Sequence, residues 1–175
     1  MKTPATLVVA ASLLVVASLQ AQDSILKNGD FEESQSFEKS DWLKGWIKFS
    51  DQPSPDEWLR TVDSGDGGNA IEIKAGPPDR YLWQDVKLKS DETGKHYVLR
   101  CQAKGQGLAS ISAVPRDATT QIGKTAQKKF PLADTFETHE VPVDIPEEAA
   151  FVRVWLTPQE EGSIVVFDKV ELLPE

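Results

Sequence analysis

In the stretch Tyr97-Val98-Leu99-Arg100-Cys101-Gln102-Ala103, apolar and polar side chains alternate from Leu99 onward. Successive side chains of a β-strand point to opposite faces, so the tyrosine, leucine, cysteine and alanine of this stretch share one buried face. The same period of two recurs through most of the chain after residue 25, between clusters of Gly, Pro, Asp and Ser. This pattern predicts an all-β protein.

The alternating segments predict about eight strands, a number typical of a jelly-roll β-sandwich. Pro142 confines the segment around it to an edge strand or to the end of a strand. Ser54-Pro55-Asp56-Glu57 has a capping serine, a proline at the first helical position and a glutamate at the third, which predicts one or two helical turns ending by Asp63. The strands are expected near Leu26 and over residues 70–74, 81–88, 96–104, 109–114, 137–143, 151–156 and 163–172.

The first 21 residues have the layout of a secretory signal peptide, with Lys2 before an apolar run over residues 7–19 and a small residue, Ala21, at the exit. The run is shorter than the ~20 apolar residues that span a membrane. We expect cleavage after Ala21, a secreted or periplasmic location, and no membrane association after cleavage. Residues 22–175 then form one domain. Cys101 is the only cysteine, so no intrachain disulfide can form.

The formal net charge is -9 at pH 7. Such a field repels phosphate backbones, and the one basic cluster, residues 124–129, is short and has no interleaved aromatic residues. Nucleic acid is therefore not an expected partner. Neutral sugars and cations are compatible with this charge.

No catalytic motif is present. The sequence contains neither G-x-S-x-G nor H-E-x-x-H, and its two histidines, His96 and His139, both fall inside predicted strands without a recognisable nucleophile. The protein is expected not to be an enzyme. Carboxylates are plentiful, however, and glycoside hydrolysis needs two of them at a set distance, so a small glycan-active enzyme stays open as a third possibility.

The five tryptophans are the most informative candidates for a binding site. Aromatic faces can stack on the C–H surfaces of sugar rings. Alternation places Trp83 away from its apolar neighbours, and it does the same for Trp155 together with Arg153. Arg100 and Gln102 point away from the core of a strand that we expect to be adjacent, which would complete an aromatic and polar surface. The alternatives are a second buried layer and a contact with a protein partner.

Trp58 is a further candidate, because it falls in a predicted loop beside acidic residues, where binding side chains are common.

Three short motifs carry a resemblance to a known family. They are the opening Asn28-Gly29-Asp30-Phe31-Glu32, the dipeptide Gly45-Trp46, and the ending Asp168-Lys169-Val170-Glu171-Leu172. With the central segment 81–104, they resemble carbohydrate-binding modules of the CenC-like type, which are galactose-binding-domain-like β-sandwiches. The resemblance covers residues 25–172 and implies that the first and last strands lie side by side.

The resemblance also implies a structural calcium ion, held by Glu32, by Asp168 and by the backbone of Asp30. Carboxylate and carbonyl oxygens are the ligands that calcium prefers. Lys169 departs from the family pattern, because a second acidic residue often stands at this position.

The leading hypothesis is a secreted, non-catalytic module that binds a polysaccharide or oligosaccharide on a concave sheet face. Trp83 and Trp155 would stack on the sugar, while Arg100, Gln102 and Arg153 would form hydrogen bonds with its hydroxyl groups. The alternative is an extracellular structural or protein-interaction β-sandwich. The sequence indicates neither the glycan nor the oligomeric state.

Overall fold

The computed structural model describes residues 23–37, 40–48, 58–76 and 80–175. Every regular element within these ranges is a β-strand. No helix of the described residues is long and apolar enough to cross a membrane. The predicted signal peptide, residues 1–21, and the helical turn predicted at residues 54–57 lie outside the described ranges.

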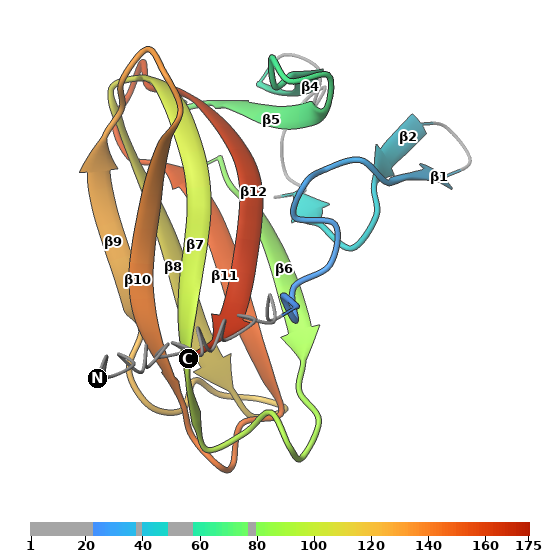
Figure 1. The fold of residues 1–175 in the computed structure, drawn as a ribbon, viewed down its shortest axis with the longest axis vertical. Helices are drawn as coiled ribbons and strands as arrows, with labels where there is room; N and C mark the ends of the chain where they lie inside the picture. The colour runs from blue at the N-terminus through green and yellow to red at the C-terminus, as the bar shows by residue number, and fades with distance from the viewer. Residues whose placement is uncertain (1–22, 38–39, 49–57, 77–79) are drawn as a thin grey trace, which may run out of the picture.

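The strands form two five-stranded antiparallel sheets and a separate two-stranded hairpin, β1-β2 (Figure 1). One sheet has the order β10-β7-β12-β5-β4 and the other β3-β6-β11-β8-β9. The two sheets face each other as a sandwich, which confirms the predicted all-β jelly-roll architecture (Figure 1). The strands are β1 Ser34–Phe37, β2 Ser40–Leu43, β3 Ile47–Lys48, β4 Leu59–Asp63, β5 Asn69–Lys74, β6 Leu82–Lys87, β7 Lys95–Gln106, β8 Leu108–Arg116, β9 Ala126–Pro131, β10 Glu137–Ile145, β11 Phe151–Pro158 and β12 Ile164–Pro174.

The core lies between the two sheets and follows the predicted alternation. In β11, Val152, Val154 and Leu156 are completely buried, and in β7 Leu99 and Cys101 are as well. Each large apolar side chain buried in this way contributes about 1.5–3 kcal/mol relative to an exposed one. Burial also raises the pKa of the Cys101 thiol to about 12, so this cysteine is an inert part of the core.

Five strands were not predicted from the sequence, and one predicted strand is absent. The segment around Leu26 is not a strand, although Leu26 is buried. Positive φ angles at Asn28 and Phe31 interrupt the extended backbone there. Leu59–Asp63 is strand β4 and not the end of a helical turn. Pro142 lies in β10, which is an edge strand, as predicted. The strands missed elsewhere are β1 with β2, β3 and β9.

The opening motif ties the amino-terminal segment to the last strand. The Val170 amide donates to the Gly29 carbonyl at 2.8 Å, and the Ile25 amide donates to the Leu172 carbonyl at 3.0 Å. A Cβ atom on Gly29 would lie 1.8 Å from the Val170 carbonyl oxygen, so only glycine allows this approach. The two ends of the domain therefore meet, although the first of them is not a strand.

Asn28 and Trp46 close the same junction. The Asn28 side chain accepts a hydrogen bond from the Glu33 amide and donates to the Glu33 and Lys44 carbonyls. The indole nitrogen of Trp46 donates to the Asn28 carbonyl at 2.9 Å, and its ring packs against Phe31. Asn28 and Trp46 are thus structural residues. Their side chains form hydrogen bonds with backbone groups that lie outside the β-sheets.

Candidate functional site

The outer surface of the sheet β3-β6-β11-β8-β9 brings most of the candidate residues together. Trp83 and Trp155 are direct cross-strand neighbours, and the register continues this row to Ile47 on one side and to Ser112 and Gln127 on the other. Both tryptophans are half-buried, as the predicted alternation requires. We call this surface the tryptophan face. Its side chains are Ile47 of β3; Trp83, Asp85 and Lys87 of β6; Phe151, Arg153, Trp155 and Thr157 of β11; Ser110, Ser112, Val114 and Arg116 of β8; and Gln127 and Lys129 of β9.

Trp83 forms a cation–π contact with Arg153. The guanidinium carbon of Arg153 lies 3.9 Å from the centroid of the Trp83 ring. Arg153 in turn donates from Nε and Nη2 to the two carboxylate oxygens of Asp85, at 2.7 and 2.8 Å. The hydrogen bond to Asp85 raises the pKa of Arg153, so the guanidinium stays charged. Its third nitrogen, Nη1, forms no hydrogen bond to any described residue and is free for a ligand.

Trp155 lies in a different environment. Its ring centroid is 6.3 Å from that of Tyr81, at an interplanar angle of 52°. The hydroxyl-bearing side chains of Ser110 and Ser112, next to it on β8, are almost fully buried beneath the longer residues around them. Neither hydroxyl forms a side-chain hydrogen bond within the described residues. The face therefore presents half-buried aromatic side chains above small, buried hydroxyl-bearing residues.

Arg100 and Gln102 do not belong to this face. They lie on β7, which is in the other sheet, so the expectation that their strand adjoins the tryptophans is wrong. Arg100 is also engaged, because its Nε donates to Glu140 at 2.6 Å and its Nη1 lies 3.8 Å from Glu171. Period-two alternation gives the face of a strand but not the sheet that the strand joins.

Trp58 is a core residue. Its side chain is 1% exposed, so the prediction that it lies in a binding loop is wrong. It immediately precedes β4 and is covered on one side by Arg80, whose guanidinium carbon lies 5.9 Å from the ring centroid. A stacking platform must be accessible to its ligand, and Trp58 is not.

The proposed calcium donors Glu32 and Asp168 both accept hydrogen bonds from protein groups. The Glu32 carboxylate accepts hydrogen bonds from the backbone amide and the side chain of Asn69. Asp168 is buried and accepts from the Lys169 amide at 2.7 Å. Desolvation raises the pKa of the Asp168 carboxyl. Within the described ranges no group of three acidic, histidine or cysteine side chains is arranged to hold a metal ion.

Lys169 supplies positive charge at this junction. Its ammonium group lies 3.0 Å from a carboxylate oxygen of Asp66, in the turn between β4 and β5. Hydrogen bonds from Ser64 and Lys169 lower the pKa of Asp66 to about 2. Asn69, which binds Glu32, lies at the end of the same turn. The residues present therefore do not fit a calcium ion, and calcium remains a prediction of the sequence resemblance.

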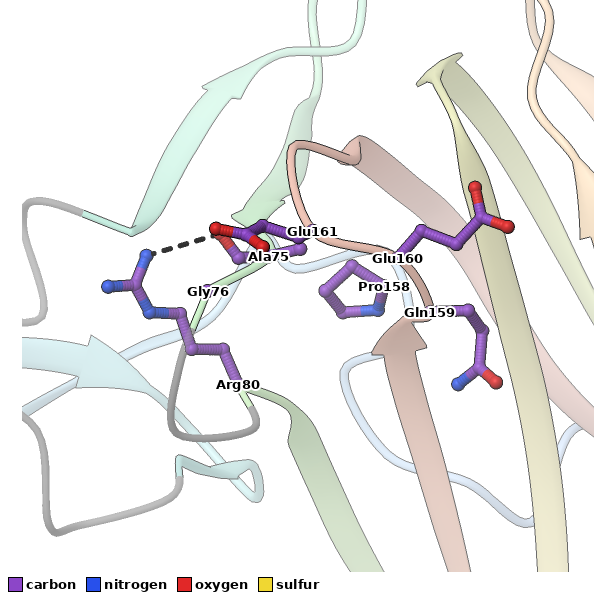
Figure 2. Close-up of a pocket in the computed structure, with 7 residues that line it drawn as sticks. All are labelled: Ala75, Gly76, Arg80, Pro158, Gln159, Glu160 and Glu161. Atoms are coloured by element: carbon purple, nitrogen blue, oxygen red, sulfur yellow. Dashed lines mark hydrogen bonds between the residues drawn. The ribbon is translucent and has the colours of Figure 1, made fainter.

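A separate hollow of about 220 Å³ lies at the end of β11. Figure 2 shows Arg80 on one side of it and Gln159 and Glu160 on the other, with Pro158 between them. Arg80 donates from Nη1 to the Ala75 carbonyl at 3.5 Å (Figure 2). None of the residues that line the hollow is aromatic, in contrast to the tryptophan face.

Several residues of the tryptophan face were missed by sequence reasoning. Ser112 joins it because β8 pairs with β11, and Gln127 and Lys129 join it because β9 pairs with β8. The segment Ala126–Pro131 looks like a basic cluster in the sequence, and its alternation is hidden because lysines occupy both of its faces. Ile47 lies on a strand of only two residues, which is too short for a periodic signal.

Comparisons with known proteins relate this fold to a class. No protein family matches the sequence, and no curated protein matches it. Solved structures do match. A CBM4 carbohydrate-binding module superposes with a TM-score of 0.57 at 18% identity, over 86% of this chain and 99% of that one. TmCBM61 in complex with β-1,4-galactotriose gives a TM-score of 0.57 at 17% identity, over 87% and 99% of the two chains.

The CBM22-1 xylan-binding domain of Paenibacillus barcinonensis Xyn10C gives a TM-score of 0.59 at 11% identity, over 88% of this chain and 96% of that one. The chain therefore has the β-sandwich fold of carbohydrate-binding modules, as the sequence resemblance predicted. Identities this low relate the folds and not the ligands.

Proposed function

We propose that this protein is a secreted, non-catalytic module that binds a glycan on its tryptophan face. The observation that carries the proposal is the row formed by Ile47, Trp83 and Trp155, which stands outside the core and is partly exposed. Trp155 would stack on a sugar ring, and Arg153 Nη1 would donate hydrogen bonds to its hydroxyl groups. The sugar-binding modules among the structural neighbours support this proposal.

The charges on the face support a non-catalytic role. A glycosidase needs two carboxyl groups on either side of the scissile bond. Among the described side chains of the tryptophan face, Asp85 is the one carboxylate, and Arg153 engages both of its oxygens. A hydrolytic pair would have to come from elsewhere.

A protein-interaction role is the second candidate. Ile47 is 45% exposed and is the one exposed large hydrophobic residue among those whose burial the structure describes. It lies directly beside Trp83, so the two could form a small apolar contact for a partner. Sedimentation of the purified domain, alone and with glycan, separates the two roles.

Affinity electrophoresis tests the proposal. Gels that contain a panel of polysaccharides should retard the wild-type protein in at least one lane. Trp155→Ala should abolish that retardation with little change in the unfolding midpoint, because Trp155 lies outside the inter-sheet core. Phe136→Ala removes a partly exposed aromatic residue that packs against Lys104 of β7, in the other sheet, and is the matched control. Equal retardation of the Trp155→Ala variant and the wild type would refute the proposed face.

A further inference from the structure

The tryptophan face carries cations that no carboxylate neutralises. Lys87, Arg116 and Lys129 all lie on it, and none of the three is paired with an acidic side chain of the described residues. Arg116 forms one hydrogen bond, from Nη2 to the Thr119 carbonyl at 3.3 Å. The Nε atom of Arg116 is buried and has no hydrogen-bond partner. Because Arg153 and Asp85 neutralise each other, these three residues leave the face with a net positive charge.

The opposite face of the sandwich is organised differently. There Arg60 pairs with Glu72 at 2.7 Å and Arg100 pairs with Glu140 at 2.6 Å, whereas Lys95 and Lys104 of β7 pair with no carboxylate of the described residues. In a chain of formal net charge -9, carboxylates are the more abundant partners. The other sheet thus mixes cations with several carboxylates, among them Glu72, Glu140 and Glu171, whereas Asp85 is the one carboxylate among the described side chains of the tryptophan face and is engaged by Arg153. The excess of positive charge is therefore a feature of the tryptophan face.

The cations flank the aromatic row. Lys87 and Arg116 lie on either side of Phe151 in the same cross-strand row, four residues along the strands from the tryptophans. Four residues of a strand span about 13 Å. Lys129 lies beyond Ser110 on the other side of the row. A chain-like ligand that stacks on Trp155 would therefore pass cations on both sides of its stacking point.

We propose that the ligand of the tryptophan face is an acidic glycan, one whose sugar units carry carboxylate or sulfate groups. This inference rests on the proposed function. A neutral glycan could accept hydrogen bonds from Lys87, Arg116 and Lys129 but would leave their charges uncompensated. A carboxylate or sulfate matches the planar donors of Arg116 and the point charges of the two lysines.

The same features fit a glycan better than a nucleic acid. Duplex DNA carries one negative charge about every 1.7 Å, and its phosphates would meet the acidic remainder of the surface. A glycan with more widely spaced anionic groups can place each of them on a cation while its neutral ring surfaces contact Trp155.

Matched glycan pairs test the inference. One pair is homogalacturonan in its de-esterified and its fully methyl-esterified form, and the other is a sulfated galactan and its chemically desulfated form. We expect the charged member of one pair to bind about tenfold more tightly than its neutral partner at low salt. If this is the homogalacturonan pair, the recognised group is a carboxylate; if it is the galactan pair, the recognised group is a sulfate. The difference should vanish near 1 M salt, where the screening length is about 3 Å.

The double variant Lys87→Gln/Lys129→Gln should bind the charged glycan about fivefold more weakly than the wild type. The control Lys95→Gln/Lys104→Gln makes the same charge change on β7, in the other sheet, and should bind like the wild type. Equal binding of charged and neutral members overturns the inference and leaves the proposed function standing. Absence of binding to any glycan overturns the proposed function as well. Retention of single-stranded DNA as strong as that of the acidic glycan would show that charge alone is recognised, which also overturns the inference.

Discussion

The guanidinium of Arg153 lies 3.9 Å above the ring of Trp83, and both residues are outward-facing side chains of adjacent strands, β11 and β6. Asp85 fixes the guanidinium through two hydrogen bonds, so the tryptophan ring is oriented before any ligand arrives. A side chain that is already ordered loses less conformational entropy on binding. Arg153 is therefore a positioning residue for the aromatic row, in addition to the hydrogen-bond donor role proposed for its Nη1 atom.

Replacing Arg153 tests this arrangement. Arg153→Ala should lower the free energy of unfolding by about 1 kcal/mol, since it removes a cation–π contact and an ion pair that is partly exposed. It should also change the tryptophan fluorescence and weaken glycan binding. Arg153→Lys keeps the charge but loses the forked hydrogen bonds, so an intermediate result is expected. Fluorescence and urea unfolding measure both effects, and an Arg153→Ala variant with unchanged fluorescence would contradict the contact.

His139 should make the stability depend on pH. It is buried, stacked on Phe130 at a centroid distance of 3.6 Å, and its pKa is lowered by burial and by Lys128, against an opposing effect of Glu137. The unfolded chain then binds a proton more readily than the folded one. The contribution of neutral His139 is complete above pH 6.5, the ordinary histidine value, and is lost as the pH falls through the lowered pKa of the folded state.

Urea unfolding at pH 7.5 and 5.5 measures this dependence. The wild type should be less stable at the lower pH, and His139→Gln should lose part of that difference. His96→Gln, at an exposed position, is the matched control and should keep the wild-type dependence. If the His139→Gln and His96→Gln variants show the same difference in stability between the two pH values, His139 is not the source of the pH dependence.

Gly29→Ala should destabilise the junction between the two ends of the domain. The added methyl group would stand 1.8 Å from the Val170 carbonyl oxygen, which is backbone and cannot move alone. We expect a loss of about 3 kcal/mol, at the upper end for overpacked sites. Gly162→Ala is the control, because it has a φ of 84° but open space around it, and it should cost only about 1 kcal/mol. Thermal unfolding with a smaller effect at Gly29 than at Gly162 would refute the close approach.

Lys169 should make the junction independent of calcium. Its ammonium group already pairs with Asp66, so exhaustive dialysis against EDTA should leave the unfolding midpoint unchanged. Lys169→Met should lower the midpoint at low salt and less at high salt, because exposed ion pairs are screened. Lys44→Met removes the exposed pair with Glu33 and is the comparison. If the unfolding midpoint falls on chelation and recovers when calcium is added, the protein binds calcium at this junction. The prediction from the family resemblance would then be correct, and the conclusion that these residues do not fit calcium would be wrong.

The long strands of this sandwich could be predicted because their signal is local. The segments at β5, β6, β7, β8, β10, β11 and β12 were found from alternation alone, and so were the outward directions of Trp83 and Trp155. The motif around Gly29 and Asp168 indicated correctly that the two ends of the domain meet. Short strands such as β3 and lysine-rich strands such as β9 were missed because neither contains enough apolar contrast to show a period.

The sequence by itself determined that this chain is an all-β sandwich with tryptophans outside the core, since alternation is a property of neighbouring residues. Only the tertiary structure decided which strands share a sheet, and this separated Arg100 and Gln102 from Trp155 and brought Ser112 and Lys129 to it. It also decided that Trp58 is buried and that Lys169 reaches Asp66. Pairing between strands far apart in the chain depends on the packing of the whole sandwich, and no local period encodes it.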